Sequence, residues 1–226
     1  MGSLSQSIGV LGGSFDPVHF GHLRLAQEAR DFLNLSEVRF IPAGHPPHRG
    51  PAKVSDVHRI AMLEIATKNN PSFRVDPREL GQLEPTYTID TLQSIRKEIG
   101  DQIPLVLFIG ADQFLLMHTW KRWQELTDIA HLLVAMRPNT EPFSPGNLMP
   151  EVRTWYQTHQ SDDPGAAKQK PAGNIFLLGL TPLAISSTAI RATIAAGQSP
   201  RYLLPDCVLD YIHTHNLYTE EGNIHH

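Results

Sequence analysis

Residues 8–22 decide the fold class, and they read IGVLGGSFDPVHFGH. The apolar run 8–11 ends at Gly12 and Gly13, which is typical of a buried strand followed by a tight turn. Apolar residues then recur at helical spacing over 22–33. A strand, a glycine turn and a helix start favour phosphate binding, because glycines let the backbone approach a ligand and the helix start offers free N–H groups.

The same alternation of strand and helix patterns continues along the chain. Apolar runs predict further strands at 37–41, 73–75, 105–109, 132–136 and 175–178, and helical spacing predicts helices at 55–69, 88–99, 112–117, 123–129, 187–196 and 206–215. This order predicts an α/β fold, a doubly wound, Rossmann-like parallel sheet with helices on both faces. Ligands of such sheets bind beyond the carboxyl ends of the strands.

Length and composition suit one globular domain. The chain has 226 residues, and 41% of them are hydrophobic. We expect residues 1–226 to form a single domain. The stretch 139–173 is rich in Pro, Gly and polar residues, so we expect a surface excursion there that is mobile around 161–170.

Charge and cysteine content narrow the classes of function. The net charge is −4 and no long basic run occurs, which argues against binding nucleic acid or a membrane surface. Cys207 is the single cysteine, so no intramolecular disulfide can form. No run reaches the ~20 apolar residues of a membrane span, and residues 1–7 do not resemble a signal peptide. We therefore expect a cytoplasmic protein, with self-association left open.

Polar side chains surround the first turn. Ser14, His19 and His22 follow Gly12 and Gly13, and all of them could donate hydrogen bonds to phosphate. A His-x-x-His pair could instead bind zinc, and His45 and His48 form a second such pair. No carboxylate near these pairs completes an obvious tetrahedral set, so zinc is the weaker interpretation.

Several motifs together resemble one family. The His19-x-Gly21-His22 element is similar to that of the HxGH nucleotidyltransferase superfamily. The wider set resembles bacterial nicotinate-mononucleotide adenylyltransferase, and comprises Ile41-Pro42, Pro46-Pro47-His48, Tyr87-Thr88-Ile89-Asp90-Thr91-Leu92, Gly110-Ala111-Asp112 and Ile185-Ser186-Ser187-Thr188-Ala189-Ile190-Arg191. The matching motifs run from residue 8 to residue 218.

This resemblance implies a reaction and its substrates. The enzyme would transfer the adenylyl group of ATP to nicotinate mononucleotide, with Mg²⁺, by direct in-line attack and without a covalent enzyme intermediate. The products would be nicotinate adenine dinucleotide and pyrophosphate, in NAD biosynthesis. Protein groups would then serve mainly to position two polyanions and to neutralise charge in the transition state.

The resemblance also assigns residues to ATP. His22 would contact the α-phosphate and His19 the neighbouring phosphates, both as catalytic residues. The other residues assigned to ATP and its phosphates are Gly12, Gly13, Ser14, His48, Arg49, Gly110, Asp112, Ser186, Ser187, Thr188 and Arg191. Arg49 stands where many family members carry lysine. Ser186 to Thr188 could instead only cap a helix, and Asp112 could be such a cap as well.

The mononucleotide is expected at a second group of residues: Phe15, Asp16, Tyr87, Thr88 and Trp120. Asp16-Pro17 could also be an ordinary turn, and Trp120 could be a core residue. The start of the 88–99 helix would favour a carboxylate over a neutral amide, which supports nicotinate over nicotinamide. An enzyme that prefers nicotinamide mononucleotide or accepts both, and a non-catalytic nucleotide sensor, remain alternatives.

Overall fold

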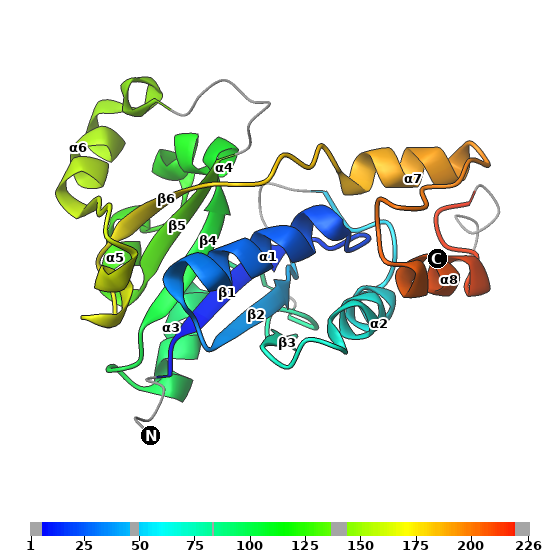
Figure 1. The fold of residues 1–226 in the computed structure, drawn as a ribbon, viewed down its shortest axis with the longest axis horizontal. Coiled ribbons are helices and arrows are strands. Elements are labelled where there is room, and N and C mark those ends of the chain that lie inside the picture. The colour runs from blue at the N-terminus through cyan, green and yellow to red at the C-terminus, as the bar shows by residue number, and fades with distance from the viewer. Residues whose placement is uncertain (1–5, 46–49, 83, 137–143, 220–226) are drawn as a thin grey trace.

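One parallel sheet organises the chain (Figure 1). The computed structural model describes residues 6–45, 50–82, 84–136 and 144–219. Within these ranges, six strands are ordered β3-β2-β1-β4-β5-β6, and every neighbouring pair is parallel. The strands are β1 (Ile8–Gly13), β2 (Glu37–Pro42), β3 (Phe73–Val75), β4 (Leu105–Gly110), β5 (His131–Met136) and β6 (Ile175–Gly179). The predicted doubly wound sheet is confirmed.

Helices cover both faces of this sheet. They are α1 (Phe20–Leu33), α2 (Asp56–Thr67), α3 (Thr88–Ile99), α4 (Ala111–Leu115), α5 (Leu126–Ile129), α6 (Pro150–His159), α7 (Ser187–Ala195) and α8 (Asp206–Thr214). Short 3₁₀ turns occupy Met117–Thr119, Trp123–Glu125, Pro145–Asn147 and Pro164–Lys168. None of the described helices is long and apolar enough to cross a membrane.

Two apolar clusters separate the sheet from its two helix layers. The strands are buried on both faces, so their apolar runs are nearly continuous. Side chains of α1, α2, α7 and α8 form one cluster, which includes Phe40, Phe108 and Phe176. Side chains of α3 to α6 form the other, which includes Val10 and Ile109. Figure 1 shows α7 and α8 reaching beyond the sheet, after a long connection from β6.

The expected surface excursion at 139–173 needs correction. Residues 150–159 form α6, and Val152, Trp155 and Tyr156 on it are buried in the second cluster. Ala167, in the stretch that follows, is buried in the first cluster. Composition does not predict this helix, because proline is usually a loop residue. Pro150 instead stands at the first position of the helix, where proline is favoured.

His131 makes the folding stability dependent on pH. Its ring is fully buried, the amide of Asn174 donates to Nδ1 at 3.0 Å, and Nε2 donates to the carbonyl of Lys170 at 2.9 Å. The bond from Asn174 requires the neutral ring, because Nδ1 accepts only while it carries no proton. Burial is the main cause that lowers the pKa of His131 to about 4, from a usual 6.5.

The pH profile of unfolding tests this arrangement. Between pH 6.5 and 4 the unfolded chain binds a proton at this residue that the folded chain does not. The contribution of His131 is therefore present above pH 6.5 and is lost as the pH falls toward 4. We expect urea titrations to show a loss of roughly 2 kcal/mol from this residue between pH 7 and pH 5. His131→Gln should show a shallower profile, and an unchanged slope would contradict the assignment.

Candidate active site

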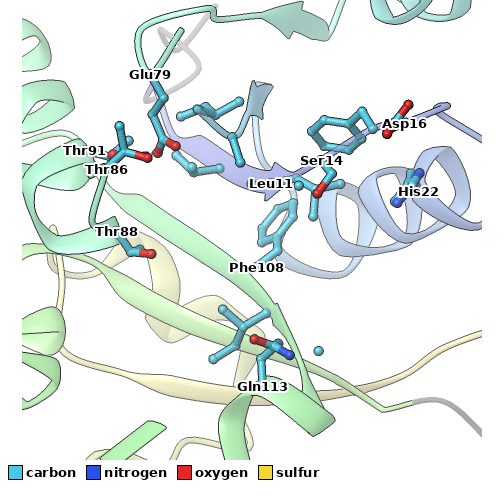
Figure 2. Close-up of a pocket in the computed structure, with 18 of the residues that line it drawn as sticks. Leu11, Ser14, Asp16, His22, Glu79, Thr86, Thr88, Thr91, Phe108 and Gln113 are labelled. Carbon is cyan, nitrogen blue, oxygen red and sulfur yellow. Dashed lines mark hydrogen bonds between the residues drawn. The ribbon is translucent and has the colours of Figure 1, made fainter. Parts of the chain in front are cut away.

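A cavity of about 550 Å³ opens at the carboxyl ends of β1, β2 and β4 (Figure 2). The strand order reverses between β1 and β4, which is where ligands of doubly wound sheets bind. Figure 2 shows Asp16 and His22 at one end, and Glu79, Thr86 and Thr91 at the other. The predicted residues that line the cavity are Gly12, Gly13, Ser14, Phe15, Asp16, His22, Tyr87, Thr88, Gly110, Asp112, Trp120, Ser187, Thr188 and Arg191.

A buried arginine on α2 holds the loop that follows β1. Arg59, on α2, is 2% exposed and donates from Nη1 to the carbonyl oxygen of Ser14 at 2.9 Å. It also pairs with Asp56, one turn earlier on the same helix. Phe15 follows with a positive φ of 48° and a ring that is 1% exposed. The loop conformation is therefore set by buried side chains before any ligand binds.

Two stacked imidazoles begin α1. The rings of His19 and His22 lie 3.7 Å apart at an interplanar angle of 20°, and Phe15 meets His22 edge-on at 5.0 Å. A Cβ on Gly21 would lie 3.0 Å from the His19 ring, so the glycine between the histidines makes room for the stack. His22 lines the cavity, whereas His19 is 2% exposed and does not. His22 therefore borders the cavity, and the buried His19 stacks against it.

Helix α7 closes the same end of the cavity. Ser186 is its N-cap, and the Ser186 hydroxyl accepts from the amide of Ala189 at 3.1 Å. The capping interpretation is therefore confirmed for Ser186, which does not line the cavity. Ser187 donates to the carbonyl of Pro17 at 2.9 Å, and Arg191 donates to the carbonyl of Asp16 at 2.6 Å. These bonds join α7 to the β1 loop.

The other end of the cavity is built at the start of α3. Tyr87 is the N-cap in an extended conformation, and its side chain makes no capping hydrogen bond. Trp120, in the segment after α4, lines the cavity as well. The Lys121 ammonium lies 4.2 Å from the centre of the Tyr87 ring and 3.0 Å from Asp90. This end thus combines aromatic rings with the start of a helix and a cation.

Asp112 occupies the end of β4. It lies in the first turn of α4, whose N-cap is Gly110, so the alternative that Asp112 is the cap is wrong. Its carboxylate faces the cavity together with Gln113. In the described part of the chain, no three His, Cys, Asp or Glu side chains cluster as metal ligands.

Some predicted residues are not placed and some lining residues were not predicted. His48 and Arg49 fall outside the described residues. Lys121 and Glu79 line the cavity, and the Thr91 hydroxyl donates to Glu79 at 2.6 Å. Lys121 could have been found from its place beside Trp120. Glu79 precedes the motif by several residues and carries no comparable signal.

Comparison with known proteins fits this geometry. A family model described as cytidylyltransferase-like matches residues 10–193. The chain belongs to the cytidylyltransferase-like family. A Dechloromonas aromatica protein is 46% identical over 95% of this chain and 99% of its own length, and a Laribacter hongkongensis protein is 47% identical over 96% of both. Both are named "Probable nicotinate-nucleotide adenylyltransferase". They confirm the family resemblance inferred from the motifs.

Solved structures of the cytidylyltransferase-like fold are similar as well. Plasmodium falciparum nicotinic acid mononucleotide adenylyltransferase, complexed with NaAD, matches with a TM-score of 0.66 and 18% identity, over 94% of this chain and 97% of that one. A putative nicotinate-nucleotide adenylyltransferase from Vibrio parahaemolyticus matches with a TM-score of 0.62 and 14% identity, over 95% and 96% of the two chains. At these identities the likeness establishes the shared fold.

Proposed function

We propose that this protein transfers the adenylyl group of ATP to nicotinate mononucleotide, and so forms nicotinate adenine dinucleotide and pyrophosphate. The observation that carries the proposal is that one cavity has two different ends. His22 and Arg191 supply anion-binding groups at one end, and Trp120 with the start of α3 supplies an aromatic and carboxylate-binding site at the other. The names of the close relatives support the same reaction.

In this proposal the protein acts by position and charge. The phosphate of the mononucleotide attacks the α-phosphorus of ATP, the bond to the β-phosphate breaks, and pyrophosphate leaves with the electron pair. His22 and Arg191 donate hydrogen bonds to the oxygens on which charge grows. The backbone of Gly12 and Gly13 lets the phosphates approach the end of β1. No side chain needs to become covalently attached.

The proposed reaction uses Mg²⁺ that binds together with ATP. Mg²⁺ binds through substrate phosphates, water and one or two carboxylates, and it would neutralise part of the polyphosphate charge. Asp112 faces the cavity and fits the role of a single carboxylate near such an ion. We also propose a cytoplasmic location, with nucleotides as the partners and with self-association left open.

The choice of substrate tests the far end of the cavity. We expect product formation with Mg²⁺-ATP to be about five- to thirtyfold faster, as kcat/KM, with nicotinate mononucleotide than with the nicotinamide analogue. A carboxylate at the start of α3 gains ~1–2 kcal/mol that a neutral amide does not. The measurement is dinucleotide formation followed by chromatography.

Each outcome of that assay is informative. Equal rates with acid and amide would keep the adenylyltransferase and overturn this account of specificity, in favour of a dual-specificity enzyme. No product from either substrate would overturn the proposed reaction and favour a nucleotide sensor.

A further inference from the structure

Asp16 is a buried carboxylate whose partners come from remote parts of the chain. The Tyr218 hydroxyl donates to Oδ1 at 2.7 Å, and the Lys53 amide donates to Oδ2 at 2.6 Å. Asp16 is 3% exposed and Tyr218 is 6% exposed. Tyr218 lies 202 residues after Asp16, beyond the end of α8. Both carboxylate oxygens are thus occupied by donors that carry no charge.

Arg191 lies beside this carboxylate at the outer limit of an ion pair, and its described hydrogen bond goes to the Asp16 backbone and not to the carboxylate. Its Nη1 donates to the backbone carbonyl of Asp16, while the nearest carboxylate oxygen, Oδ2, is 4.0 Å away. Its Nη2 lies 3.3 Å from the hydroxyl of Thr188. The guanidinium lines the cavity and keeps further N–H donors. A hydrogen bond between arginine and a carboxylate is among the strongest in proteins. The 4.0 Å separation of Arg191 and the Asp16 carboxylate therefore needs a structural cause.

We propose that Tyr218 is a positioning residue whose hydroxyl holds the Asp16 carboxylate at this distance from Arg191, so that the remaining N–H donors of Arg191 stay available to polyphosphate. This inference rests on the proposed function of the cavity as an ATP site. Without the hydroxyl, Oδ1 would lose its donor, and the carboxylate would turn toward the guanidinium as the nearest remaining donor. The distant ion pair would then become a direct hydrogen bond, which would occupy N–H donors of Arg191 and compensate its charge more fully.

The Tyr218 hydroxyl is suited to this task because it stays protonated. Burial raises the pKa of Tyr218, and the negative charge of Asp16 raises it further. The charges of Arg191 and Arg59 oppose this shift but do not cancel it. The hydroxyl therefore keeps its proton and acts as a donor at neutral pH.

The test compares two tyrosines whose hydroxyls form hydrogen bonds with different residues. Tyr218→Phe removes the bond to Asp16. Tyr211→Phe also removes a hydrogen bond of a tyrosine hydroxyl, the one between Tyr211 and the ring of His58 at 3.0 Å, where α8 meets α2 outside the cavity. We expect Tyr218→Phe to raise the KM for ATP and the Kd for inorganic pyrophosphate about tenfold. Tyr211→Phe should change neither constant, although both variants should lose similar thermal stability.

A double variant separates positioning from a general loss of packing. Asn at position 16 carries no charge and cannot neutralise Arg191, so Asp16→Asn combined with Tyr218→Phe should bind pyrophosphate more tightly than Tyr218→Phe alone. Equal changes in the two tyrosine variants, or no recovery in the double variant, would overturn the proposal. Pyrophosphate binding is measured by calorimetry without turnover. An inactive wild type that still shows this binding pattern would therefore overturn the proposed reaction while leaving the role of Tyr218 intact.

Discussion

His22→Ala should lower kcat by a factor of about a hundred to a thousand while the protein stays folded. His22 is the histidine that faces the cavity, and loss of one fixed donor to a developing negative charge typically costs that much. Stability should change little by comparison, because the His22 ring is only partly buried and Phe15 keeps its contact with Phe40. Steady-state kinetics with saturating ATP and nicotinate mononucleotide, together with a thermal melt, provide the measurement.

A matched histidine controls for the substitution itself. His213 is exposed on α8 and does not line the cavity, so His213→Ala should leave kcat within about twofold of wild type. If His22→Ala turned over as fast as His213→Ala, His22 would have no catalytic part. The same result would favour the sensor, in which nucleotides bind but do not react.

Gly12→Ala should reduce kcat/KM by roughly ten- to hundredfold without loss of stability. Among the described residues, no atom lies within 4 Å of a Cβ built on Gly12, and the residue lines the cavity at the end of β1. The added methyl group therefore meets no part of the protein and occupies space that a bound phosphate needs. An intrusion of one methyl group into a filled site costs ~1–3 kcal/mol.

Gly179→Ala is the matched control for this variant. Gly179 also ends a parallel strand, β6, and also has open space where its Cβ would stand, but it does not line the cavity. Its kcat/KM should equal that of wild type, and the melting temperatures of both variants should be unchanged. Normal activity in Gly12→Ala would mean that ligand phosphates do not approach the end of β1.

The sequence predicts the sheet well because buried parallel strands leave a plain signal. Apolar runs such as 105–109 admit few other interpretations, and the glycine turn after β1 fixes where the first ligand group lies. Helix α6 was missed because the prolines and glycines around it outweighed its own pattern. Val152, Trp155 and Tyr156 nevertheless stand at positions i, i+3 and i+4.

The sequence predicts the motif residues of the site, but it does not predict the tertiary contacts that hold them in place. Residues that follow strands, such as Asp112 and Ser14, must gather at one edge of the sheet, and they do. Phe15 and Asp16 were expected to contact the mononucleotide; both border the cavity, yet the structure turns their side chains mainly into the protein. Nothing in a sequence pairs Asp16 with Tyr218, because that bond depends on tertiary packing. Contact of Phe15 and Asp16 with the mononucleotide remains a prediction.

The distance in sequence between Asp16 and Tyr218 has a consequence for protein synthesis. A ribosome delivers β1 and its loop first, and all six described strands have been made by residue 179. The sheet can therefore assemble around β1 before α7 and Tyr218 have left the ribosome. A nascent chain at that stage has the phosphate loop but lacks Arg191 and the hydroxyl that keeps it available. On the proposed role of Tyr218, the phosphate-binding end of the cavity is therefore complete only after residue 218 has left the ribosome.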